Sequence, residues 1–131
     1  MTNITVAGTG YVGLVTGVCL AEVGHSVTCV DNVQDKIDLL NKGISPIYEP
    51  QLDELIVKNA QSGKLAFTTD YEVAYSRSDV IFIGVGTPEN EDGSANLNFV
   101  YTVARQIAEN IERDCLVVIK STVPIGTNDK V

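Results

Sequence analysis

The chain has 131 residues, 44% hydrophobic and 20% charged, with a formal net charge of −8 at pH 7. This size and composition are typical of one globular domain with its own core. The sequence has no Lys/Arg cluster, which argues against nucleic acid as a partner because phosphate-backbone binders normally present a basic face. It also has neither an apolar run approaching the roughly 18 residues of a membrane span nor a recognisable signal peptide, so we expect no membrane partner and a cytoplasmic location.

Apolar runs typical of strands alternate with helical patterns along the chain. The predicted strands cover residues 3–7, 26–30, 65–68, 80–85 and 115–120. The predicted helices cover residues 11–23, 34–42, 51–61, 71–76 and 97–111. The runs at 80–83 and 116–119 are continuously apolar, which favours strands covered on both faces. The pattern therefore predicts the α/β class, with a Rossmann-type doubly wound parallel sheet and right-handed crossovers.

A glycine-rich turn joins the first predicted strand to the first predicted helix. Gly8 permits a tight turn, Gly10 lets the backbone approach a pyrophosphate, and Gly13 lets the helix pack closely on the sheet. Asp31, about 20 residues on, ends the second strand, where a carboxylate accepts hydrogen bonds from ribose hydroxyls and repels a 2′-phosphate. The predicted cofactor is therefore NAD rather than NADP. A glycine-rich turn that binds nothing remains the alternative, with Asp31 as a turn residue or helix N-cap.

Three further loops follow strand ends, where open parallel sheets bind ligands. Lys36 can reach the adenosine ribose or a phosphate, although an ordinary solvated lysine fits its spacing too. Thr87 can bond to a ribose or phosphate oxygen, with an ordinary Gly-Pro turn as the alternative. Thr122 can hold the nicotinamide carboxamide or place a water. We interpret the acidic run 89–93 as a solvated turn, and predict no metal site, because the run does not fill a calcium-loop pattern.

Four segments in order carry a family resemblance: residues 7–15, 43–50, 86–97 and 121–127. Together they resemble the N-terminal NAD-binding domain of the UDP-glucose/GDP-mannose dehydrogenase family, over nearly the whole chain. Gln51 departs from the pattern, since the family usually has glycine after the Glu-Pro pair. We expect this residue to stiffen the start of the following helix without touching the cofactor.

The resemblance implies residue roles and a reaction. The predicted NAD-binding residues are Gly8, Gly10, Tyr11, Val12, Gly13, Asp31, Lys36, Thr87 and Thr122. Thr122 is the one predicted catalytic residue, as a group that positions water near the reacting carbon. The family oxidises the C6 alcohol of a nucleotide sugar to a carboxylate in two steps, with two NAD and a catalytic cysteine. The cysteines of this chain match no such position and are expected to be small buried residues in a reducing compartment. They are Cys19, Cys29 and Cys115.

The sequence stops at Val131, barely one turn into a helix predicted to start near Thr127. We therefore expect residues 1–131 to be the NAD-binding domain of a longer chain, truncated after the fifth or sixth strand region, without its central helix and sugar-binding domain. Such a piece would bind NAD but be catalytically incomplete. The longer protein is expected to be a homodimer that acts on UDP-glucose, ahead of UDP-N-acetylmannosamine or GDP-mannose. A 3-hydroxy-acid or phosphogluconate dehydrogenase and a non-enzymatic NAD-sensing Rossmann module remain alternatives.

Overall fold

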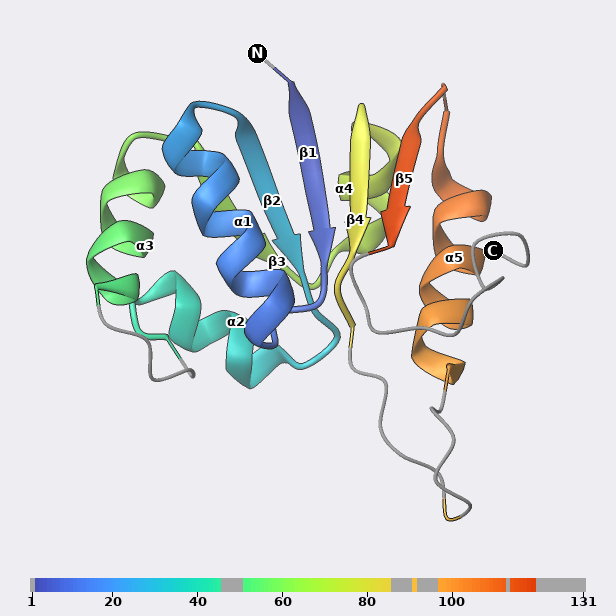
Figure 1. The fold of residues 1–131 in the computed structure, drawn as a ribbon, viewed down its shortest axis with the longest axis horizontal. Helices are drawn as coiled ribbons and strands as arrows, with labels where there is room; N and C mark the ends of the chain where they lie inside the picture. Colours follow the sequence, from blue (N-terminus) through green and yellow to red (C-terminus); the bar gives the residue numbers. More distant parts are fainter. Residues whose placement is uncertain (1, 46–50, 86–90, 92–96, 113, 120–131) are drawn as a thin grey trace.

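Strands and helices alternate along the chain, and the strands form one parallel sheet (Figure 1). The computed structural model describes residues 2–45, 51–85, 91, 97–112 and 114–119. Within these residues the strands are β1 (Asn3–Ala7), β2 (Ser26–Val30), β3 (Leu65–Thr68), β4 (Val80–Ile83) and β5 (Leu116–Ile119). The helices are α1 (Tyr11–Val23), α2 (Gln34–Asn41), α3 (Leu52–Gln61), α4 (Tyr71–Ser76) and α5 (Asn98–Asn110). The predicted α/β class is confirmed.

The sheet has the strand order β3-β2-β1-β4-β5, with every neighbouring pair parallel. The chain leaves β1 for β2 and β3 on one side, and then crosses over to β4 and β5 on the other. The winding direction therefore reverses between β1 and β4. In open α/β sheets a ligand crevice forms at this point, outside the carboxyl ends of the strands.

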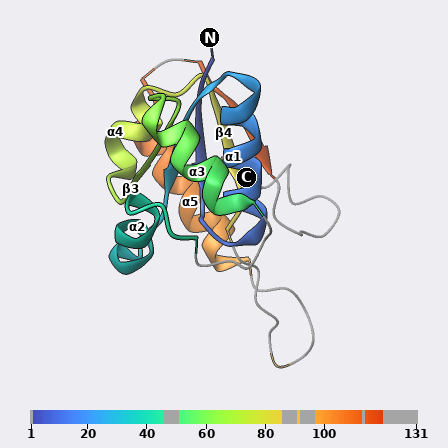
Figure 2. The same ribbon diagram turned by 90° about the vertical axis from the view of Figure 1, so that its left-hand side faces the viewer.

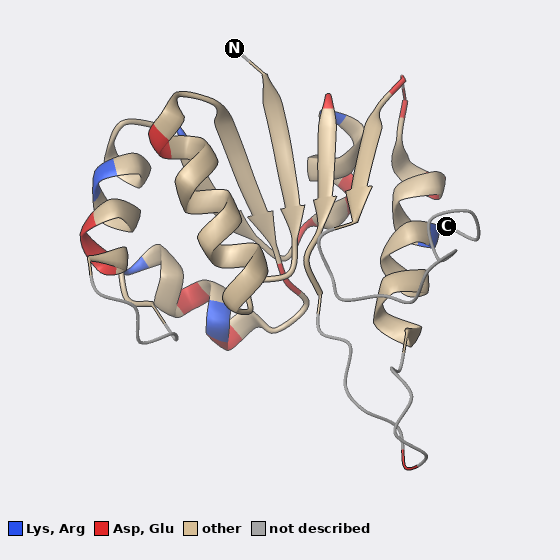
Figure 3. Ribbon diagram, in the orientation of Figure 1, with Lys and Arg blue, Asp and Glu red and all other residues tan. Residues whose placement is uncertain are grey.

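Helices cover both faces of the sheet. Helices α1 and α3 contact each other on one face, and α4 and α5 contact each other on the opposite face (Figure 2). No described strand contains a charged residue, and Figure 3 shows the charges on helices and connecting segments. Four of the five residues of β1 are buried, as expected for a central strand covered on both sides.

The core has two parts, one beneath each helical layer. The part under α1 and α3 includes Val6, Leu14, Val18, Ile37 and Ile56. The part under α4 and α5 includes Ala7, Tyr75, Ile81, Ile83 and Val100. Because β1 supplies Val6 to one part and Ala7 to the other, this strand joins the two halves of the molecule.

Several predicted boundaries were wrong by one or two residues. The fourth strand ends at Ile83 rather than at residue 85, although the Gly84 amide still donates to the carbonyl of Ala7 at 2.8 Å. The fifth strand begins at Leu116 rather than at Cys115, and Lys120 lies outside the described residues. Helices α2 and α5 are also one or two residues shorter than predicted, because Lys42, Leu97 and Ile111 are cap residues rather than helical ones.

Gln51 lies just before α3 rather than inside it. It is the N-cap of that helix, with φ of 68° and ψ of −2° in the left-handed region. Glycine adopts this conformation without the strain that a Cβ introduces. The structure thus gives a physical reason for the glycine that the family usually has at this position.

Glu22 ties α1 to α3 on the outer surface. Its carboxylate accepts hydrogen bonds from Lys58 Nζ at 2.6 Å and from Asn59 Nδ2 at 2.9 Å. The bond from Lys58 is the main reason that the pKa of Glu22 lies below its usual value. This link helps to hold the crossover between β2 and β3 against the first helix.

The cysteines differ in burial. Cys29 is buried in β2, and burial raises the pKa of its thiol to about 12, so it behaves as a small apolar residue. The prediction of burial was wrong for Cys19, which is exposed because α1 turns Leu14, Gly17 and Val18 toward the sheet instead. It was also wrong for Cys115, which is partly exposed just before the edge strand β5. In the described part of the chain no helix is long and apolar enough to span a bilayer.

Candidate cofactor-binding site

A cleft of about 410 Å³ lies at the carboxyl ends of β1, β2 and β4, where the winding reverses. Its floor is the glycine loop from Gly8 to Gly10, and one side is the segment from Asp31 to Lys36. Helices α4 and α5 supply the other side, with Tyr71 and Phe99 among the lining residues. We call this hollow the cofactor cleft.

Three glycines, Gly8, Gly13 and Gly84, lie beneath the cleft, where the backbones of β1, α1 and β4 approach one another closely. Gly8 has φ of 104°, and a Cβ on it would lie 2.7 Å from the carbonyl oxygen of Gly84. A Cβ on Gly13 would lie only 2.1 Å from the carbonyl oxygen of Gly8. The roles predicted for Gly8 in the turn and for Gly13 in helix packing agree with this geometry, and Gly84 completes the contact from β4.

Gly10 stands in a different environment. It is the N-cap of α1, with an ordinary extended backbone (φ −72°, ψ −172°). A Cβ on it would meet no described atom within 4 Å, so no contact within the described protein requires glycine here. Bare backbone at the positive end of the helix suits a pyrophosphate, which approaches such N–H groups closely.

Asp31 is partly buried at the end of β2 and lines the cleft. Its Oδ2 accepts from the Thr9 amide at 3.0 Å and from the Thr9 hydroxyl at 2.7 Å. Its Oδ1 accepts from the Val33 amide at 3.0 Å. The carboxylate therefore closes a turn, as the alternative reading allowed. A carboxylate has about four lone-pair sites, so one site on Oδ1 is still able to accept from a ribose hydroxyl.

The remaining predicted residues divide into three groups. Lys36 lies in the first turn of α2 and lines the cleft. Tyr11 and Val12 begin α1 beside the cleft but do not line it, and they are 59% and 42% exposed. Thr87 and Thr122 lie outside the described residues.

The sequence reasoning did not identify the wall formed by α4 and α5. Tyr71 and Tyr75 line the cleft, with ring centroids 5.8 Å apart, and burial raises the pKa of Tyr75. Phe99 and Gln106 come from α5. The four-residue spacing of the tyrosines signals a shared helix face. That signal does not distinguish core from ligand wall, because both are apolar.

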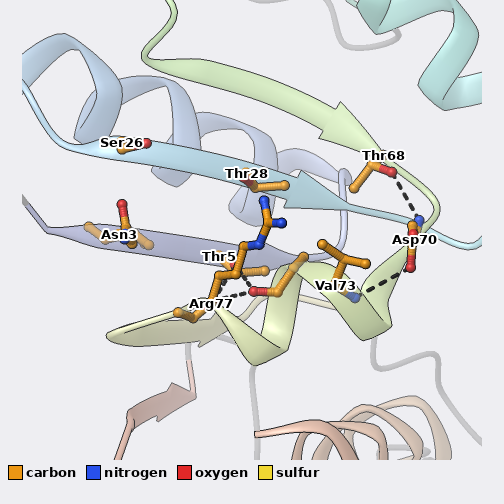
Figure 4. A pocket seen from close by; sticks show the side chains of 11 residues that line it. Asn3, Thr5, Ser26, Thr28, Thr68, Asp70, Val73 and Arg77 are labelled. Carbon is orange, nitrogen blue, oxygen red and sulfur yellow. Dashed lines mark hydrogen bonds between the residues drawn. The ribbon is translucent and has the colours of Figure 1, made fainter. Parts of the chain in front are cut away.

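A second hollow, of about 390 Å³, lies between α4 and the faces of β1, β2 and β3 (Figure 4). We call it the hydroxyl pocket because five hydroxyl side chains line it: Thr5, Ser26, Thr28, Thr68 and Ser78. Figure 4 shows Arg77 reaching across it toward Thr28.

Several polar groups of this pocket are bonded to their neighbours. The hydroxyls of Thr5 and Ser78 lie within hydrogen-bond distance of each other and of the Ala74 carbonyl in α4, and their two protons supply two of these three contacts at a time. The Thr68 hydroxyl accepts from the Asp70 amide, and Asp70 caps α4 by accepting from the Val73 amide. These bonds hold α4 on the sheet.

Comparison with known proteins links the glycine loop to one family. The family model for the NAD-binding domain of the UDP-glucose/GDP-mannose dehydrogenase family matches residues 2–131. A UDP-glucose 6-dehydrogenase of Bacillus subtilis, YwqF, is 58% identical over 127 residues, which are 97% of this chain and 29% of that protein. The UDP-glucose 6-dehydrogenase of Rhizobium meliloti is 54% identical over 98% of this chain and 30% of its own length. The chain thus spans about three tenths of these relatives.

Comparison with solved structures leads to the same family. A ternary complex of GDP-mannose dehydrogenase from Pseudomonas aeruginosa is 44% identical, with a TM-score of 0.94 over 98% of this chain and 30% of that chain. The UDP-N-acetyl-mannosamine dehydrogenase Cap5O from Staphylococcus aureus is 34% identical, with a TM-score of 0.88 over 96% of this chain and 30% of that one. A 3-hydroxyacyl-CoA dehydrogenase from Archaeoglobus fulgidus is 19% identical, with a TM-score of 0.64 over 95% of this chain and 35% of that one, and shares the fold alone.

Proposed function

We propose a role in nucleotide-sugar oxidation from the premise that this chain belongs to the UDP-glucose/GDP-mannose dehydrogenase family, as its NAD-binding domain. The cofactor is NAD. The proposed activity of the protein that carries this domain is UDP-glucose 6-dehydrogenase, which oxidises UDP-glucose to UDP-glucuronate in two NAD-dependent steps. The observation that carries the proposal is a cleft at the winding reversal, with an open Gly10 in its floor and a partly satisfied Asp31 in one side.

Each part of the cleft has a proposed task. Backbone N–H groups at the start of α1 hold the pyrophosphate above Gly10, with Tyr11, Val12 and Gly13 in the same turn. Asp31 accepts from the adenosine ribose, and Lys36 adds a positive charge near the ribose or phosphate. Bound NAD supplies a hydride acceptor.

The two threonines outside the described residues keep their predicted tasks as proposals. Thr87 contacts NAD, and Thr122 contacts NAD and positions water near the reacting carbon. The sugar-binding residues, the catalytic cysteine and the dimer interface belong to the part of the enzyme beyond this domain. Because its three cysteines are free, as is usual in a reducing compartment, we propose that the protein is cytoplasmic.

UDP-glucose is the proposed substrate because the relatives at 58% and 54% identity are UDP-glucose 6-dehydrogenases. The GDP-mannose and UDP-N-acetylmannosamine enzymes among the solved structures are less similar, at 44% and 34% identity. In the enzyme that carries this domain, NADH formation measured with each of the three nucleotide sugars tests the ranking. Faster turnover of either competitor would overturn it.

Calorimetric titration of the chain with NAD and NADP tests the cofactor proposal. We expect NAD to bind more tightly than NADP, and Asp31→Ala to weaken NAD binding by about tenfold or more, because hydrogen bonds to a charged group are lost. Asp35→Ala is the matched control, since Asp35 lies close by in the chain, in the first turn of α2, but does not line the cleft. A folded chain that binds neither dinucleotide contradicts the proposal.

A further inference from the structure

We propose that the Thr9 hydroxyl is a positioning group for Asp31, and that through this contact it helps to set the preference for NAD over NADP. The inference rests on the proposed function, because it concerns the same cleft. Thr9 occupies the variable position between Gly8 and Gly10, where the glycine pattern specifies no side chain.

The Thr9 side chain points into the protein, not into solvent. Thr9 is 1% exposed, although it lies on a loop at the floor of an open cleft. Its hydroxyl lies 2.7 Å from Asp31 Oδ2, and its amide nitrogen lies 3.0 Å from the same oxygen. An ionised carboxylate only accepts hydrogen bonds, so the hydroxyl must donate. One residue thus binds one oxygen of Asp31 twice.

Three bonds leave the carboxylate with one usable acceptor position. Both lone-pair sites of Oδ2 are taken by Thr9, and one site of Oδ1 is taken by the Val33 amide. The open site on Oδ1 is the one available to a ribose hydroxyl. Donors from the glycine loop and from the start of α2 hold the carboxylate from two sides, so its orientation is fixed before the ligand arrives.

Hydrogen bonds orient the Asp31 carboxylate, but no ion pair with a described residue neutralises its negative charge. Among the described residues, the ion pair with a nitrogen–oxygen distance within 4.0 Å is that of Lys58 with Glu22. No described Lys or Arg forms an ion pair with Asp31. Hydrogen bonds from Thr9 and Val33 orient the carboxylate but leave its full negative charge at the cleft. A fixed negative charge disfavours a 2′-phosphate more strongly than one that can rotate away.

Loss of the Thr9 hydroxyl should therefore affect the two dinucleotides differently. Binding of NAD must then order a carboxylate that has lost one of its three hydrogen-bond donors, so the affinity for NAD falls. NADP meets a carboxylate that is free to turn aside, so its affinity falls less or rises. A purely structural role for Thr9 would weaken both dinucleotides alike and leave their ratio unchanged.

The test measures NAD and NADP dissociation constants by calorimetry for the chain and three variants, each checked for folding by circular dichroism and urea denaturation. Thr9→Val removes the hydroxyl with little change of shape, and we expect the NAD/NADP affinity ratio to fall by about fivefold or more. Thr9→Ser keeps the hydroxyl and should keep the ratio within about twofold. Thr5→Val is the matched control, because Thr5 is also buried and hydrogen-bonded but lines the hydroxyl pocket.

The outcomes separate this inference from the function on which it rests. If the unmodified chain binds neither dinucleotide, the proposed function fails and the inference fails with it. If the chain prefers NAD but Thr9→Val retains that ratio, the function stands and the inference is wrong. Should Thr9→Val not fold, Thr9→Ser decides, since a ratio shifted by more than about fivefold with the hydroxyl present contradicts positioning through that group.

Discussion

The two hollows of this sheet are almost equal in volume, about 410 Å³ for the cofactor cleft and about 390 Å³ for the hydroxyl pocket, but they differ in their polar groups. In the hydroxyl pocket, Thr5 and Ser78 bond to each other and to α4, and Asp70 caps that helix. In the cofactor cleft, Asp31 retains an acceptor position, and Gly10 presents bare backbone at a helix N-terminus.

Thr5, Ser78 and Asp70 use their polar groups within the fold, whereas Asp31 keeps an acceptor position, so these side chains differ in what they can offer a ligand although the two hollows are alike in volume. Polar side chains that bond to each other stabilise the fold, whereas those with remaining capacity are able to bind a ligand. The glycines divide in the same way. Gly8 and Gly13 are required by close backbone contacts, but no described contact requires Gly10. Each difference is testable by substitution.

Gly13→Ala should have the largest effect. Its new methyl group would lie 2.1 Å from the Gly8 carbonyl oxygen and 3.4 Å from that of Gly84, and neither strand can move without breaking the sheet. We expect the free energy of unfolding to fall by about 3 kcal/mol, with dinucleotide binding lost as well. Urea denaturation followed by circular dichroism measures the change. A variant as stable as the parent would show that β1, α1 and β4 are not in close contact.

Gly10→Ala should weaken NAD binding with little effect on stability. Its backbone angles suit alanine and its Cβ would meet open space, so we expect the free energy of unfolding to change by less than about 1 kcal/mol. The methyl group would, however, stand between the helix N-terminus and the pyrophosphate, and NAD affinity should fall by about tenfold. Calorimetry and denaturation on the same sample give both numbers. Unchanged affinity would remove the ligand-based reason for this glycine.

Thr5→Val should lower stability without weakening NAD binding, and its effect should be smaller. The substitution removes the buried Thr5 hydroxyl, which bonds to Ser78 and lies within hydrogen-bond distance of the Ala74 carbonyl, while the Ser78 hydroxyl keeps its own bond to that carbonyl. We expect the free energy of unfolding to fall by about 1 kcal/mol, with NAD affinity unchanged. Weakened NAD binding in a stable, folded variant would mean that the two hollows are coupled through β1.

Most of the fold could be predicted from the sequence because local and global signals agree. The boundaries of β1, β2, β3, α1 and α4 were predicted to the residue, since Gly, Asp or a change of periodicity marks each end. Continuous apolar runs at 80–83 and 116–119 correctly indicated strands, but coverage on both faces was wrong for 116–119, because β5 lies at the edge of the described sheet and none of its residues is buried. The left-handed Gln51 was not predictable as such, because a glutamine carries no signal for that conformation.

The site could be predicted only in part. The glycine-rich turn and the aspartate about 20 residues after it located Gly8, Gly13 and Asp31, because each position has a geometric requirement that a residue type reveals. Thr9 could not be found in this way, since its role depends on a partner 22 residues away whose side-chain direction the sequence does not contain. The aromatic wall from α4 and α5 was missed for a similar reason, because only the folded sheet brings Tyr71 and Phe99 to one cleft.

The order of strands in the sheet also sets an order of events during synthesis. β1 pairs with β2, which follows it closely in the chain, and with β4, which comes much later. Just before β4, Asp79 bonds to Asn3, 76 residues earlier in the chain. At roughly 5–20 residues per second, a ribosome releases the glycine loop about 4–15 seconds before the residues of β4. During that interval Gly84 has not yet closed the base of the loop. A nascent chain therefore has the glycine loop before it has the cofactor cleft, whose base is not closed until β4 joins the sheet and whose wall still lacks α5 at that point.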